Sequence, residues 1–376
     1  MAALAPVASG AGTKSAEEGK CHLLPGHGRI CVVLLGGKAR LASLQARYPL
    51  KLISPRNALP RSPGAACVYV LAYGGGLVGG DATTLDVEVG AGATLGLLSQ
   101  GSTKVFKARS PGDWQTSSQT LTCRVHAGAT LAVLPGPVTP FRNARYSQRT
   151  SIDVGPGGSL LWLDWVTSGR REMTPPAKRR AADRGGDPAG PAGGGGPQGL
   201  PDEAEEDDRE NWSFALYESS TSVRRCGRVV VRDSTRLDND GGGGGDAFSR
   251  QACAASPDLP SPPPGPPSAR STLVSHLMRP YSAIATLILQ GPACAELVAY
   301  ALRDFEELSY SARPSAPPAV VWSASPVREG TKEGDDVHGV VIRAAASDTE
   351  TLHQLLKQRL RGVERIIGGD LWDRCL

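Results

Sequence analysis

The sequence predicts a mainly β protein, a distorted stack of sheets or β-solenoid-like domain, with two helices in the C-terminal region. Three similar segments carry this prediction: VEVGAGATLGLL from Val87, CRVHAGATLAVL from Cys123 and IDVGPGGSLLWL from Ile152. Each joins an alternating strand to a second apolar strand through a glycine turn. Because such units bury a face against the next unit, they predict stacked β-layers. The unequal spacing of the turns favours a distorted stack or layered sandwich over a strict helix of repeats.

The glycine-rich stretch AYGGGLVGGD at 72–81 fits G-x-G-x-x-G, the dinucleotide-binding fingerprint, at Gly74, Gly76 and Gly79. That fingerprint needs a helix that begins within the glycines. Here ATTLDVEV follows with apolar residues at every second position, which predicts a strand. The dinucleotide site is therefore excluded. The loop is either a turn packed on neighbouring backbone, or a loop that carries a partner's surface or lines a passage. Asp81 is also a candidate to cap it.

The C-terminal third predicts strands at 281–291, 319–325 and 339–346, with one helix after the first strand and another after the last. Pro292 fits the first turn of a helix whose apolar stripe continues to Leu308. A second helix is predicted over 347–368, with an apolar face, a capping box of Ser347 and Glu350, and Gly368 at its end.

Composition divides the chain into a disordered N-terminus at 1–26 and one domain at 27–376. Low-complexity insertions at 175–209 and 238–270 interrupt that domain, since sequences so rich in glycine, proline and charge cannot bury enough apolar surface to fold. Long loops of this kind leave a domain at small entropic cost.

The charge and the scattered ligand residues exclude several classes of protein. A net charge of +4 without a basic, aromatic-interleaved stripe argues against nucleic acid as a partner. No apolar run is long enough for a membrane span and no signal peptide is visible, so we expect a cytoplasmic protein. The 8 cysteines and 6 histidines lie apart, which predicts reduced thiols and no zinc motif.

Seven motifs occur in the order found in one known family. They are GGGLVGGD (74–81), SQGSTKVFK (99–107), LPGPVTPFRNARYSQ (134–148), DWVTSGRRE (164–172), NWSFALYES (211–219), YSAIATLILQGP (281–292) and the segment 340–368. With these motifs the chain resembles the urease accessory proteins called UreD, or UreH in some bacteria. The amino-acid sequence of the motifs is more similar to the eukaryotic members than to the bacterial ones. The chain departs from the family pattern by about forty residues inserted between Glu172 and Trp212, and by a second insertion after Leu237.

The resemblance implies a non-enzymatic scaffold that binds apo-urease. With the accessory protein UreF and the GTPase UreG, such a protein promotes nickel insertion and lysine carbamylation at the urease site. It also implies no permanently bound cofactor, but transient Ni²⁺, which some members are thought to carry through an internal water-filled passage.

Three acidic residues within the motifs are candidates to line such a passage: Asp81, Asp164 and Glu172. A transit path needs weak, exchangeable oxygen ligands, which carboxylates supply. Asp164 is the best of them, because LLWLDWV places a carboxylate within an apolar strand, where a charge is costly unless paired or hydrated. Each carboxylate also has an ordinary interpretation as a solvated or capping group.

The loop PVTPFRNARYSQ is a candidate partner-binding surface, through Phe141, Arg142, Arg145 and Tyr146. Aromatic and arginine side chains on a proline-stiffened loop are typical interface anchors, although the loop can also simply pack on its own sheet. Lys104 is either paired with an internal carboxylate or an ordinary surface lysine.

Two other functions remain open on the sequence alone. A secreted-type β-solenoid carbohydrate-active enzyme would use paired carboxylates. It would need secretion and an aromatic-lined groove, and the sequence holds only 5% aromatic residues. The other is a β-scaffold unrelated to nickel.

Overall fold

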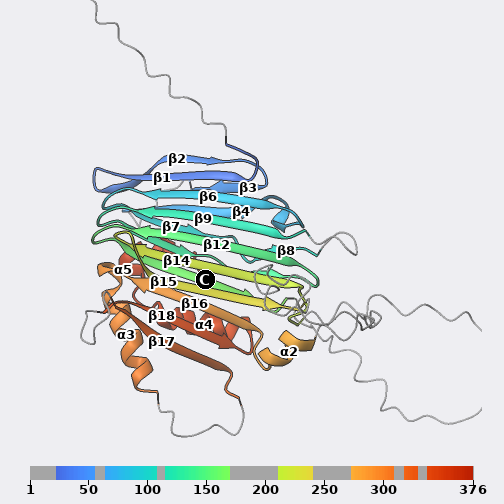
Figure 1. Cartoon of the computed structure of the whole chain (residues 1–376). Helices are drawn as coiled ribbons and strands as arrows, with labels where there is room; N and C mark the ends of the chain where they lie inside the picture. Colours follow the sequence, from blue (N-terminus) through green and yellow to red (C-terminus); the bar gives the residue numbers. More distant parts are fainter. Residues whose placement is uncertain are drawn as a thin grey trace, which may run out of the picture.

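Two stacked β-sheets form the body of the protein, and helices cover the outer face of one of them (Figure 1). The computed structural model describes residues 23–55, 64–107, 115–169, 211–239, 272–308, 317–328 and 337–375. Within these ranges the predicted mainly β, stacked-sheet fold is confirmed. Glu172 and nearly all of both predicted insertions lie outside the described residues.

The first sheet, sheet A, has seven strands, and a parallel centre is flanked by an antiparallel strand at each edge. In spatial order they are β15 (Arg228–Asp238), β14 (Leu216–Arg225), β12 (Arg145–Val154), β9 (Ser117–Val125), β6 (Ala82–Val89), β1 (His27–Leu35) and β2 (Lys38–Ala46).

The second sheet, sheet B, is parallel from β4 to β13 and antiparallel beyond. Its main path is β17 (Val320–Arg328), β18 (Val337–Ala346), β16 (Ala283–Gln290), β13 (Ser159–Thr167), β10 (Thr130–Leu134), β7 (Thr94–Leu98), β4 (Ala65–Ala72) and β3 (Leu50–Ile53). Three short strands extend it: β5 (Gly76–Leu77), β8 (Thr103–Val105) and β11 (Val138–Pro140).

The three similar segments stack in the register in which their sequences align. Val87 of β6 pairs with Cys123 of β9, which pairs with Ile152 of β12. Thr94, Thr130 and Ser159 pair in the same way in sheet B. The turns follow one another, because the amide of each turn glycine donates to a carbonyl of the next turn, as from Gly92 to Ala127 at 3.0 Å. The three turn glycines have φ of 64° to 69°, the left-handed region that glycine adopts at little cost.

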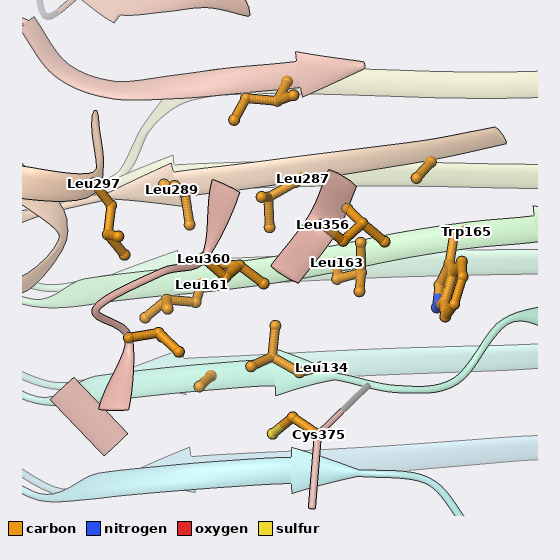
Figure 2. Close-up of a cluster of buried hydrophobic side chains, with 14 of the residues drawn as sticks. Leu134, Leu161, Leu163, Trp165, Leu287, Leu289, Leu297, Leu356, Leu360 and Cys375 are labelled. Atoms are coloured by element: carbon orange, nitrogen blue, oxygen red, sulfur yellow. The ribbon is translucent and has the colours of Figure 1, made fainter. Parts of the chain in front are cut away.

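Three apolar clusters form among the described residues, and the alternation of side chains along the strands accounts for the two that lie on either face of sheet B. One lies between the sheets and contains residues such as Ile30, Leu131 and Trp162. The other lies between sheet B and the C-terminal helices, where Leu163 and Trp165 of β13 meet Leu356 and Leu360 (Figure 2). Successive residues of β13 thus enter different cores, which explains why this strand reads as a continuous apolar run.

Both predicted C-terminal helical segments are present, but the second is not one helix over 347–368. The first is α3 (Ala295–Glu306), preceded by the 3-10 turn Pro292–Cys294. The second is divided into α4 (Thr349–Arg359) and the short helix α5 (Glu364–Ile367), with Gly362 between them at a φ of 99°, and α6 (Gly369–Trp372) lies beyond the predicted end at Gly368. The apolar stripe of 347–368 is buried as expected. One further short helix, α2 (Thr272–Met278), was not predicted.

The predicted capping box of Ser347 and Glu350 is wrong. Asp348 is the N-cap of α4, and its side chain accepts from the amide of Thr351 at 2.8 Å. Ser347 instead donates its hydroxyl to the Asp348 carboxylate at 3.0 Å. A carboxylate placed one residue later serves the free amides of the first turn better than the hydroxyl does, because it also interacts with the helix dipole.

The glycine-rich stretch joins two strands and launches no helix, as the sequence predicts. After β4 the chain forms a 3-10 turn at Tyr73–Gly75, then β5, and enters β6 at Ala82. The Asp81 carboxylate accepts from the amide of Val78 at 2.9 Å, so Asp81 caps this loop. Gly76 permits close approach, since a Cβ there would lie 2.6 Å from the carbonyl oxygen of Lys104.

Candidate polar passage between the sheets

A row of polar side chains crosses the inner face of sheet A, where a β-sandwich ordinarily places apolar residues. Strand pairing aligns its members across five strands. These residues, called here the polar row, are Thr83, Gln119, Gln148, Ser219 and Thr235. They point inward because they lie an even number of residues from buried positions of the same strands, such as Val87, Cys123 and Ile152.

Asp164 faces this row from β13. Its carboxylate accepts from the hydroxyl of Ser219 at 2.5 Å and from that of Tyr217 at 3.5 Å. Burial raises the pKa of Asp164; the bond from Ser219 opposes the rise, the charge of Asp233 adds to it, and the bond from Tyr217 opposes it. The sequence-based expectation of a costly carboxylate within an apolar strand therefore has a structural basis.

The tyrosines beside Asp164 belong to the same polar network. Tyr146 and Tyr217 stack with ring centroids 5.8 Å apart. The Tyr146 hydroxyl lies 2.6 Å from Oε1 of Gln119 and 2.7 Å from Oε1 of Gln148. Since the hydroxyl has one proton, only one amide oxygen can accept it at a time, and the other amide must turn its NH₂ group toward the hydroxyl oxygen. Burial, with Asp164 nearby, raises the pKa of both tyrosines well above its usual value, so both stay protonated.

Two adjoining pockets follow the polar row. The inner pocket, about 170 Å³, lies between the sheets and is lined by Thr83, Gln119 and Gln148. The outer pocket, about 450 Å³, lies at the edge strands β15 and β17 and is lined by Thr235, Thr286 and Arg343, among others. Asp164 lines both, so it sits at their junction. We call the two pockets together the passage.

Two buried polar atoms belong to residues that line the inner pocket. Trp162 and Thr150 line it, and Nε1 of Trp162 and Oγ1 of Thr150 have no hydrogen-bond partner among the described residues. Leaving such groups unpaired in a protein interior costs about 1–3 kcal/mol each.

At the outer pocket an ion pair links the two sheets. Arg343 of β18 donates to Asp233 of β15 at 2.5 Å, and the Asp233 side chain is only 12% exposed. Asp233 also lies close enough to Asp164 to raise its pKa. Two carboxylates and one guanidinium are therefore gathered at this end of the passage.

Comparison with known proteins identifies the family. The family model described as "UreD urease accessory protein" matches residues 25–184 and 205–370. The chain belongs to the UreD family. UreD proteins are urease accessory proteins without catalytic activity of their own, and the alternative of a carbohydrate-active enzyme is therefore set aside.

The relatives come from bacteria, fungi and plants. The chain is 30% identical to the urease accessory protein UreD of Anaeromyxobacter sp., covering 94% of this chain and 90% of the relative. It is 30% identical to urease accessory protein 4 of Cryptococcus neoformans, over 94% of this chain and 96% of the relative. It is 27% identical to urease accessory protein D of Arabidopsis thaliana, over 91% and 97%. The resemblance to the UreD family, eukaryotic members included, is thus confirmed.

The structure separates the carboxylates that the sequence predicts for the UreD passage. Asp164 lies in the passage, whereas Asp81 is not among the residues that line either pocket and caps its own loop. Glu172 lies outside the described residues. His126, in a repeat turn, bonds Glu88 at 2.9 Å, and its side chain is 42% exposed. The described residues contain no group of three or more His, Cys, Asp or Glu side chains that could hold a metal ion.

The predicted partner-binding loop is largely turned inward. Phe141 is 7% exposed and packs edge-on against Phe106, while Tyr146 is fully buried in the network beside Asp164. Arg142 and Arg145 are half-buried. Of the four candidates, only the two arginines are accessible to a partner in this conformation. Lys104, by contrast, is an exposed lysine.

The polar row was missed by reasoning from the sequence, although the sequence holds a signal for it. The repeat begins at Val87, Cys123 and Ile152, and four residues before each stand Thr83, Gln119 and Gln148. Extending the alignment backward by two inward-facing positions would have placed these three polar residues in one row. Ser219 and Asp233 lie beyond the repeat and carry no such signal.

No helix in the described part of the chain is long and apolar enough to cross a membrane.

Proposed function

We propose that this chain binds apo-urease and, with UreF and the GTPase UreG, promotes insertion of nickel into the urease site, and that Ni²⁺ crosses the protein through the passage. The observation that carries the proposal is the polar row facing Asp164 between two otherwise apolar sheet faces. Stability alone does not favour such an arrangement, because burying polar groups costs free energy that apolar residues would not.

The chemistry of the passage suits a cation in transit. Ni²⁺ takes nitrogen and oxygen ligands, and a site that must release the ion needs few and exchangeable ones. Asp164 supplies one carboxylate, the polar row supplies hydroxyl and amide oxygens, and the remaining positions on the ion are left to water. In this view nickel is cargo, and the protein has no permanently bound cofactor.

The role of the protein is then positional. It holds apo-urease, UreF and UreG together in the cytoplasm and keeps the ion away from competing ligands in bulk solvent. It catalyses no reaction itself. Tyr146, Gln119 and Gln148 fix the wall of the passage, since the Tyr146 hydroxyl bonds the amide groups of both glutamines.

Reconstitution of purified apo-urease with UreF, UreG, bicarbonate and Ni²⁺ tests the proposal, with nickel bound per urease measured by elemental analysis. Wild-type protein is expected to raise nickel loading over its omission, and Asp164→Ala to lower it while the complex still assembles. The control is Asp153→Ala, which removes an exposed carboxylate from the outer face of sheet A. Equal loading with wild type and Asp164→Ala would remove the passage from the proposal. Equal loading with and without wild-type protein would refute the whole.

A further inference from the structure

Exposed aromatic and basic side chains surround the end of the inner pocket that lies away from Asp164. Tyr48 is 69% exposed and Tyr73 is 48% exposed, with ring centroids 5.5 Å apart. Nζ of Lys51 lies 5.4 Å from the centroid of the Tyr73 ring. Arg47 and Lys104 are exposed next to them. We call these five residues the collar.

The collar residues are neighbours of residues that line the inner pocket. Leu50, Ala72, Gly75 and Thr103 line that pocket, and each lies next to or within two residues of a collar residue in the chain; Gly76 lines it as well. Pairing of β5 with β8 brings Gly76 beside Lys104. The labels of β3 and β8 mark this end of the sheets on the right in Figure 1.

The segments that form this end carry more positive than negative charge. Residues 47–55, 69–81 and 99–107 contain Arg47, Lys51, Lys104 and Lys107, and one acidic residue, Asp81, whose carboxylate accepts from the amide of Val78. On the other side of the inner pocket, Asp164 marks the junction with the outer pocket, which Arg343 lines while pairing with Asp233. The passage therefore runs from an end with carboxylates to an end with ammonium and guanidinium groups.

This polarity has a consequence for a divalent cation. Lysine and arginine charges within a Debye length, about 8 Å at physiological ionic strength, repel it. The ion is then drawn in at the carboxylate end and held back at the collar as long as the collar faces solvent. Exit becomes favourable only when an acidic surface covers the collar and compensates its charge.

The collar also has the composition of a protein interface. Tyrosine and arginine are enriched among the residues that anchor interfaces, and complementary charge speeds and orients docking. Gly74 and Gly75 add bare backbone, because nothing lies within 4 Å of a Cβ built at either residue. Three basic residues in the collar of a chain of net charge +4 favour a protein partner over nucleic acid.

We propose that the collar docks an acidic face of apo-urease, so that the end of the passage opens only onto the recipient of the ion. This inference rests on the proposed function, which supplies apo-urease as the recipient. The double variant Lys51→Glu/Lys104→Glu tests it, together with Tyr73→Ala, which removes an aromatic anchor without changing charge. The control, Lys38→Glu/Lys357→Glu, makes the same change of net charge at exposed lysines outside the collar.

Binding of each full-length variant to immobilised apo-urease is measured from about 50 to about 500 mM NaCl, and circular dichroism verifies folding. The collar double variant is expected to bind about ten-fold or more weakly than the control at low salt, with a flatter salt dependence, and Tyr73→Ala to bind more weakly at every salt concentration.

Three results would overturn the inference: equal binding of collar and control variants to apo-urease, a loss confined to binding of immobilised UreF–UreG, or collar-dependent binding of a duplex DNA probe. If wild-type protein itself neither binds apo-urease nor raises its nickel content, the proposed function fails instead. The two failures are thus distinguishable.

Discussion

Replacing Asp164 by asparagine is expected to stabilise the folded protein at and above neutral pH. The amide keeps an oxygen that can accept from the Ser219 hydroxyl, which lies 2.5 Å from the carboxylate in the native protein. The amide is uncharged, so burying it between the sheets does not remove water from a charge. For Asp164 this loss of hydration is the largest cause of the raised pKa. The substitution thus removes a cost of folding while leaving the shape of the site nearly unchanged.

The sign with pH follows from the direction of the shift. The folded pKa of Asp164 lies above the unfolded value of about 3.9, so between the two the native state binds more protons than the unfolded state. Stability therefore falls as pH rises through that window, and the loss is complete above the folded pKa. Asparagine has no such loss, so the advantage of the variant grows with pH and then levels off.

The magnitude follows from the surroundings. Burying an imperfectly compensated polar group costs about 1–3 kcal/mol in proteins, and Asp164 keeps two hydroxyl donors and partial exposure through the outer pocket. We expect Asp164→Asn to raise the free energy of unfolding at pH 8 by the lower end of this range, about 1 kcal/mol, which corresponds to about 2 °C in melting temperature. Urea unfolding at a series of pH values, from the unfolded pKa of about 3.9 up to about pH 8, measures it, with Asp153→Asn as an exposed control. A gain that is independent of pH, or a loss of stability at pH 8, would refute the reasoning.

Two further predictions concern the framework. Leu356 of α4 is 1% exposed in the core between sheet B and the helices (Figure 2). Leu356→Ala should therefore lower the free energy of unfolding by about 2–5 kcal/mol in urea titrations. A cost below about 1 kcal/mol would show that α4 does not close that core. Gly291 and Gly128 both have positive φ, but a Cβ would lie 2.2 Å from the carbonyl oxygen of Gly158 at the first and in open space at the second. Gly128→Ala should cost about 1–2 kcal/mol and Gly291→Ala clearly more; equal costs would contradict the backbone contact.

Much of the fold could be predicted because its determinants are local. The alternation of Leu85, Val87 and Val89 fixes a strand and the face that it buries, and the turn glycines fix where each layer reverses. The register of the three layers could also be read, since the segments align without gaps. The cap of α4 could not, because Ser347 and Asp348 are both good caps and only the backbone at the helix start decides between them.

The passage was only half predictable. Asp164 stands out in the sequence as a carboxylate in an apolar strand, but its partners Ser219 and Tyr217 lie more than fifty residues away and reach it through the stacking of two sheets. Asp81 was a candidate for the passage and for a loop cap, and its carboxylate accepts from the backbone amide three residues before it, as a cap does. Polarity alone could not distinguish a residue that lines a cavity from one that caps a loop.

Anomalous diffraction at the nickel edge from crystals soaked in Ni²⁺ tests the central claim most directly, because it places the ion. The account predicts anomalous density between the sheets, beside Asp164 and the polar row, that weakens in Asp164→Ala. Density confined to surface histidines, with none between the sheets at any Ni²⁺ concentration the crystals tolerate, would contradict it.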